Sequence, residues 1–201
     1  MDVGVVVDNA PAARLVRRVL DDARIKVFDA QDRSGAIMGV GSLAEQGLAG
    51  VLLLDSDTLE DRALEELRLE IGHLVRIGNA ARPRRLVLAI PQVEAILFTD
   101  LRGLEKALGK QLTAEQAMEA RFRPKAVFYR LLGKPKDAEK CAITIINRLG
   151  DDSLRRMAEH PMMREIREYV EQVQPRARLR SISDPPGRWK RARRTKIRHA
   201  S

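Results

Sequence analysis

Three aspartates in the first part of the sequence have the types and the spacing of a metal site. Asp8 follows the apolar run VGVVV, and Asp55 and Asp57 end the run VLLLDSD with one serine between them. Residues two apart in an extended chain point to the same side, so we expect Asp55 and Asp57 to share a face. Carboxylates this close repel unless a cation lies between them or one is protonated. Because Mg²⁺ prefers carboxylate oxygens, the pattern predicts a divalent metal held by Asp8, Asp55 and Asp57.

A fourth acid, Glu94, follows the next apolar run along the chain, RRLVLAI, shortly after Pro91. If that run is a strand, Glu94 reaches the same edge of the sheet, where it would join Asp8 as a catalytic acid. A structural role is the alternative, because the helix dipole favours a glutamate in the first turn of a helix. The sequence leaves both roles open.

The elements that position these acids alternate between strands and helices. Apolar runs predict strands at 3–7, 25–30, 51–55 and 84–90, and helical periodicity predicts helices at 10–23, 34–47 and 58–75. This alternation is typical of a mostly parallel sheet with helices on both faces. In open parallel sheets, ligands bind beyond the carboxyl ends of the strands, which is where the four acids fall.

After Pro91 the sequence shows only helical periodicity. The segment 92–109 predicts one helix, and shorter helices follow at 113–120, 124–132, 137–149 and 151–173, the last interrupted near Pro161. For the earlier helix at 58–75, we expect Thr58 to be the N-terminal cap. We therefore expect an α/β domain over 1–110, a helical extension packed on it over 111–174, and a tail over 175–201.

The net charge of +9 is concentrated in that tail. Residues 176–198 contain ten lysines and arginines and one acid, Asp184, with little apolar content, which predicts disorder. Arginine pairs with phosphate and Trp189 can stack on an unpaired base, so we expect backbone-directed nucleic-acid binding. A solubilising or partner-binding tail is the alternative. The candidate nucleic-acid-binding residues are Arg188, Trp189, Lys190, Arg191, Arg193, Arg194, Lys196 and Arg198.

Composition also indicates a compartment. Apolar runs fall short of the ~18 residues that suggest a membrane span, and the N-terminus reaches a strand at once, unlike a signal peptide. One cysteine, Cys141, permits no internal disulfide. We expect a cytoplasmic protein that does not associate with membranes.

The order of these features resembles a known family. An acid after the first strand and a D-x-D after the third, within α/β alternation, resemble the TOPRIM domain of primases, topoisomerases, OLD-type nucleases and small ribosomal-RNA maturases. P-x-x-E-x-x-L-x-x-D at 91–100 and RPKAVFYRLL at 123–132 are similar to small TOPRIM-like proteins of bacterial defence loci, including the RloB type. The resemblance covers about residues 3–133.

That resemblance implies a nuclease that uses Mg²⁺ or Mn²⁺, with Asp55 and Asp57 on the metal. Asp8 stands where the family has a glutamate that acts as general acid/base, and Asn9 stands where it usually has glycine. Asn9 tolerates a left-handed backbone, which would preserve the turn. The shorter Asp8 affects proton transfer, which needs contact near ~3 Å, more than it affects metal binding.

Two other functions stay open. A TOPRIM-like module without catalysis would bind nucleic acid or a partner protein. A receiver-like regulatory domain is the second alternative, although Asp8 is a single acid and Lys134 lies too far along for the lysine that receivers carry after a fifth strand. The sequence has no G-x-x-x-x-G-K-[ST] motif, so any ATPase would be a separate partner.

Overall fold

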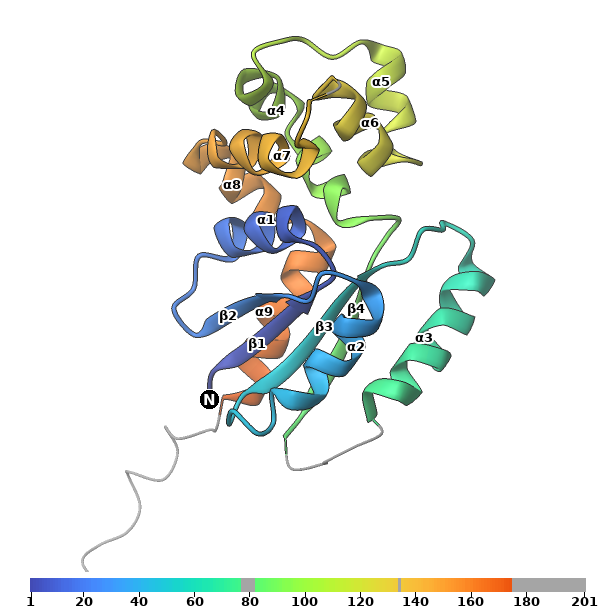
Figure 1. Cartoon of the computed structure of the whole chain (residues 1–201), viewed down its shortest axis with the longest axis vertical. Helices are drawn as coiled ribbons and strands as arrows, with labels where there is room; N and C mark the ends of the chain where they lie inside the picture. The colour runs from blue at the N-terminus through green and yellow to red at the C-terminus, as the bar shows by residue number, and fades with distance from the viewer. Residues whose placement is uncertain (77–81, 134, 175–201) are drawn as a thin grey trace, which may run out of the picture.

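Four strands form a single sheet in which every neighbouring pair is parallel (Figure 1). The computed structural model describes residues 1–76, 82–133 and 135–174. The strand order β2-β1-β3-β4 places β1 and β3 in the centre, and the predicted α/β fold with a parallel sheet is confirmed. The strands are β1 Val3–Val7, β2 Ile25–Asp29, β3 Ala49–Asp55 and β4 Arg84–Ala89.

The two central strands are buried along their whole length. Their sequences are continuous apolar runs because both faces of the sheet are covered by helices. The register aligns Val6 of β1 with Leu52 of β3, and Asp55 of β3 with Ala89 of β4. The chain therefore leaves β1, β3 and β4 at one common carboxyl edge.

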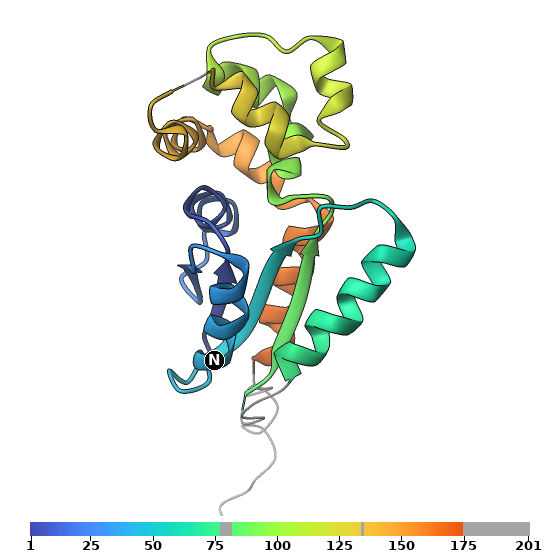
Figure 2. The same ribbon diagram turned by 45° about the vertical axis from the view of Figure 1, so that its right-hand side comes forward.

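Helices cover both faces of this sheet. On one face, α1 (Ala10–Leu20) and α9 (Pro161–Val173) share an apolar core with alternate residues of the strands. On the other, α2 (Arg33–Ser42) and α3 (Asp61–Arg76) pack on the intervening strand residues. Figures 1 and 2 show α3 lying outside β4, the last strand of the sheet.

A group of short helices lies beyond the carboxyl edge of the sheet, at the top of Figure 1. It begins with a 3₁₀ helix, η1, that follows β4, and ends before α9 returns along the sheet. Most of the predicted helices are confirmed, and Pro161 starts α9 as expected from proline at a first helical position. The helices are η1 Val93–Thr99, α4 Leu101–Leu108, α5 Ala114–Glu119, α6 Pro124–Leu131, α7 Ala138–Asn147 and α8 Asp151–Ala158.

Two predicted boundaries are wrong for local reasons. The hydroxyl of Thr58 accepts the N–H of Glu60 at 3.1 Å, which forms a turn, and α3 begins only at Asp61. The continuous helix expected over 92–109 is divided at Asp100 into η1 and α4. Most of the apolar residues of that segment are buried as expected, but they belong to two consecutive elements.

The basic segment 175–201, for which we predicted disorder, lies outside the described residues. Within the described ranges, no helix combines the length and the apolar character needed to cross a membrane. The expected helical extension, 111–174, includes α9, which shares the sheet's main core.

Candidate functional site

Asp55 lies at the centre of the candidate site, at the last position of β3. Its side chain is 6% exposed. The Oδ1 atom accepts the backbone N–H of Val93 at 2.8 Å, and Oδ2 lies 3.4 Å from the ammonium of Lys125. The start of η1 and the start of α6 therefore both converge on the end of β3.

The pKa of Asp55 reports how crowded this edge is. Burial raises the pKa to about 6, although the Lys125 charge and the Val93 hydrogen bond oppose the rise. The charges of Asp8 and Asp57 raise it further. Both aspartates therefore lie within electrostatic range of Asp55.

Glu94 is buried without the partners that a buried carboxylate normally has. It is 4% exposed, and neither carboxylate oxygen has a hydrogen-bond partner among the described residues. Burial, and then the charge of Asp55, raise its pKa to about 7 against the opposing charge of Lys125. A helix-dipole role requires no burial, so the dipole alone does not explain why this acid is enclosed.

Lys125 is a site residue that we did not predict. It follows Pro124, the first residue of α6, so its position on the first helical turn is fixed. Burial lowers its pKa, but the charges of Glu94 and Asp55 outweigh that effect and the pKa is raised overall. Tyr129, one turn later, has a pKa raised by burial and then by the charge of Glu94. No local pattern in RPKAVFYRLL identifies Lys125 as a site residue.

Asp57 occupies a different environment from Asp55. It is exposed, and its φ of 55° is left-handed, so the strand does not continue through it. Our reason for placing Asp55 and Asp57 on one face required an extended chain, and this reason is wrong. Gln92 Nε2 donates to Asp57 Oδ1 at 2.7 Å, while Gln92 Oε1 accepts the N–H of Lys125 at 3.1 Å. Gln92 thus connects the loop after β3 to the start of α6.

Asp8 sits half-buried directly after β1. Its Oδ1 accepts the side-chain amide of Asn9 at 2.7 Å, and Asn9 Oδ1 accepts the N–H of Ala12 at 2.8 Å. Asn9 is extended (φ −155°) and caps α1, so the left-handed backbone that we expected there is wrong. Asn9, fixed in place as the cap of α1, therefore fixes the position of the Asp8 carboxylate as well.

Asp55, Glu94 and Asp8 lie within electrostatic range of the Lys125 ammonium group. Among residues 1–76, 82–133 and 135–174, no three or more His, Cys, Asp or Glu side chains are arranged to hold a metal ion. Lys125 supplies the positive charge beside Asp55. Lys134 and the candidate nucleic-acid-binding residues 188–198 lie outside the described residues.

Comparisons with known proteins add no family. No protein-family model matches the sequence, and a search of the curated proteins finds no match.

Proposed function

We propose that the chain is a Mg²⁺-dependent phosphodiesterase of DNA or RNA, with a TOPRIM-like site at the carboxyl edge of its sheet. The observation that carries this proposal is Glu94, an enclosed carboxylate with two unpaired oxygens beside a second buried acid, Asp55. A buried carboxylate without hydrogen bonds is costly, and a cation placed close to it is one arrangement that offsets the cost.

The donor set fits a hard cation once Lys125 has moved. Asp55 Oδ2 would hold Mg²⁺ with Asp8 as a second ligand, Glu94 would lie beside the ion without binding it, and Asp57 would be left at the exposed entrance. The Lys125 side chain is 36% exposed, so its long stem can turn its ammonium toward solvent or toward a substrate phosphate. Mg²⁺ would supply charge stabilisation to the phosphoryl group under attack.

Glu94 is the side chain best suited to move a proton. Its pKa of about 7 lets it accept and return a proton near neutral pH, whereas Asp8 is engaged by Asn9. In this proposal Glu94 takes the acid/base role that the TOPRIM resemblance implied for Asp8. Lys125, released from Asp55, pairs with the substrate phosphate.

The test is cleavage of plasmid DNA and of structured RNA with Mg²⁺ or Mn²⁺, together with melting curves with and without each ion. Asp55→Asn should lower the cleavage rate about a thousandfold or more, on the order of 4 kcal/mol, and remove the ion-dependent rise in melting temperature. Asp29→Asn is the matched control, because Asp29 ends β2 at the same edge but is exposed. It should leave both readouts unchanged.

A TOPRIM-like module without catalysis is the second candidate, and the ion pair of Lys125 with Asp55 favours it. If the lysine is a permanent replacement for the metal, wild type cleaves nothing and its melting temperature ignores both ions. That pair of results would refute the phosphodiesterase.

The basic tail would supply nucleic-acid affinity in either case. Deleting residues 176–201 should weaken binding to DNA or RNA and flatten its dependence on salt, because each lost phosphate contact reduces the slope of log K against log salt by about 0.9. Fluorescence anisotropy at several salt concentrations measures both quantities. Equal slopes for the full chain and the truncated chain would contradict a nucleic-acid role for the tail.

A further inference from the structure

The outer edge of β4 carries backbone groups that no strand among the described residues pairs with. β4 is the last strand in the sheet order, and the amides and carbonyls of Arg85, Val87 and Ala89 face β3 by the parallel register. Those of Leu86 and Leu88 therefore face away from the sheet. Edge strands of stable monomers are usually covered or blunted, because such groups pair readily with another strand.

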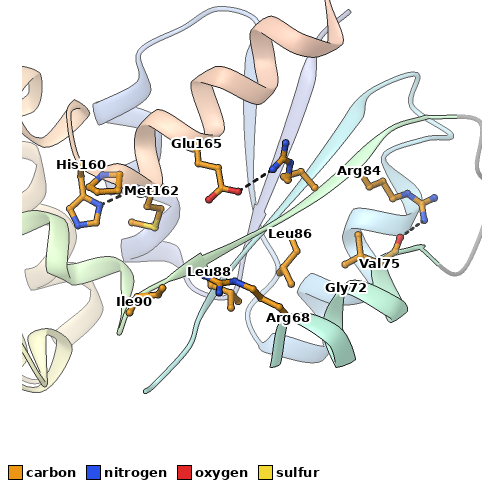
Figure 3. Close-up of a pocket in the computed structure, with 12 residues that line it drawn as sticks. Arg68, Gly72, Val75, Arg84, Leu86, Leu88, Ile90, His160, Met162 and Glu165 are labelled. Atoms are coloured by element: carbon orange, nitrogen blue, oxygen red, sulfur yellow. Dashed lines mark hydrogen bonds and ion pairs between the residues drawn. The ribbon is translucent and has the colours of Figure 1, made fainter. Parts of the chain in front are cut away.

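A slot runs along this edge. Its cavity of about 820 Å³ has β4 as its floor, one wall from α3 at Arg68 and Gly72, and the other from the start of α9 at Met162 and Glu165. Figure 3 shows Arg68, Leu86 and Leu88 on the α3 side of β4 and Glu165 on the other side. β4 has six residues, so its edge offers roughly 20 Å at ~3.3 Å per residue.

Two features of the α3 wall suit an incoming chain. Gly72 lies within a helix, where glycine costs roughly 1 kcal/mol relative to alanine, yet an added Cβ there would meet nothing within 4 Å. Its small size is thus not needed for packing within the chain, and it keeps the wall open. Arg68 is exposed and has no ion pair or hydrogen bond with the described residues.

A second copy does not fit this slot through its own β4. α3 projects beyond β4 in both views (Figures 1 and 2), and two paired strands lie only ~4.8 Å apart. Antiparallel pairing of two β4 strands would bring both α3 helices into the same space, because packed helices need about 8–10 Å.

The chain that follows α9 does not suit it either. α1 leads from β1 to β2, whereas α3 leads from β3 to β4 in the opposite direction on the opposite face. A parallel strand beyond β4 reached through α9, on the α1 face, would therefore have the opposite hand to these right-handed crossovers. The segment is also strongly basic, like Arg68.

We propose that this slot binds an extended, acidic segment of a partner protein as a fifth strand, with a carboxylate on Arg68. The backbone of the segment pairs with Leu86 and Leu88. Its side chains alternate between Arg68 on the α3 side and Met162 on the α9 side. Neither the acid cluster nor the proposed nuclease activity is involved.

The probe is a blocked, fluorescent seven-residue peptide that alternates valine and glutamate, titrated into the full chain and followed by anisotropy. A matched peptide carries lysine in place of glutamate. We expect at least tenfold tighter binding of the acidic peptide, reversal of that preference in Arg68→Glu, and slower exchange of the Leu86 and Leu88 amides in the complex. Gly72→Leu should weaken binding at least tenfold, while Gly41→Leu, an open helical glycine on α2, should not.

The basic tail could bind the acidic peptide without any involvement of the slot. The variants distinguish binding to the tail from binding to the slot. Attraction of the acidic peptide to the tail would persist in Arg68→Glu and Gly72→Leu and would leave the Leu86 and Leu88 amides unprotected. That result overturns the proposal, as does the absence of binding by either peptide. Protection of those amides by a single-stranded oligonucleotide or by self-association, without protection by the peptide, would also overturn it.

Discussion

Glu94 and Asp100 lie six residues apart and are both almost inaccessible to solvent, yet their surroundings are opposite. They are 4% and 7% exposed. Asp100 Oδ2 accepts the guanidinium of Arg156 at 2.8 Å, and hydrogen bonds from Ser153 and the N–H of Gly103 also reach the carboxylate. Burial raises the pKa of Asp100, but these hydrogen bonds outweigh it and the pKa is lowered overall, whereas the pKa of Glu94 is raised to about 7.

The contrast shows that burial alone does not identify a functional acid. At Asp100 the chain is built around the carboxylate, because a methyl group on Gly103 would overlap both Asp100 and Ser153. At Glu94 the described residues provide no such partners. Asp100, whose hydrogen bonds are satisfied, links α4 to α8. Glu94, which lacks such partners among the described residues, is available to interact with a ligand.

Asp100→Ala should give the largest change in stability. We expect the free energy of unfolding to fall by about 3 kcal/mol, because several hydrogen bonds to a buried charge are lost together. Urea denaturation at pH 7 measures it, with Ser153→Ala as a milder control at about 1 kcal/mol. A loss below 1 kcal/mol for Asp100→Ala would show that the two acids do not differ as described.

Glu94→Gln should act in the opposite direction. At pH 8 the free energy of unfolding should rise by about 3 kcal/mol, because the folded state no longer has to ionise an enclosed acid, and each pKa unit corresponds to ~1.4 kcal/mol. The pKa of about 7 against a usual 4.5 sets the sign. A less stable Glu94→Gln protein at pH 8 would contradict the unpaired state of this carboxylate.

The pH profile distinguishes the two acids in wild type. An acid whose folded pKa is raised keeps its proton longer in the native state, so stability is highest below the unfolded pKa and falls as pH rises toward 7. Glu94 and Asp55, with pKa values of about 7 and about 6, both act in this window. Asp100, with a lowered pKa, stabilises above the unfolded value, and that stabilisation is lost on acidification below about pH 4.

The corresponding measurement is the free energy of unfolding at constant salt from pH 3 to pH 8. Wild type should lose about 3 kcal/mol more than Glu94→Gln between pH 4.5 and pH 8. Asp100→Asn should instead flatten the acid limb below pH 4. Parallel curves for wild type and Glu94→Gln would rule out the raised pKa.

Asp57 should give the smallest effect. Asp57→Ala should lower the free energy of unfolding by about 1 kcal/mol, because alanine tolerates the left-handed backbone poorly. Asp57→Asn tolerates it and should change stability by less than about 0.5 kcal/mol. Equal losses in both variants would show that the backbone conformation is not the cause.

The sequence was most informative where burial is uniform. The apolar runs of β1 and β3 are unambiguous because both faces of these strands are covered, and they placed Asp8 and Asp55 at one edge. Lys125 was missed because it reaches Asp55 from 70 residues away, and nothing local in RPKAVFYRLL indicates that approach. Asp57 was misplaced because one left-handed residue ends the period-two pattern of a strand.

The placement of α9 has a consequence for how the chain is made. This helix is the last described element, yet it covers a face of the sheet that contains β1 and β4, and its Glu171 reaches back to Arg24 at 3.1 Å across 147 residues. During synthesis at ~5–20 residues per second, the part of that face that α9 covers stays exposed beside α1 for several seconds after β4 has left the ribosome. Nascent chains of this protein therefore expose apolar sheet surface until almost all of the described chain has been translated.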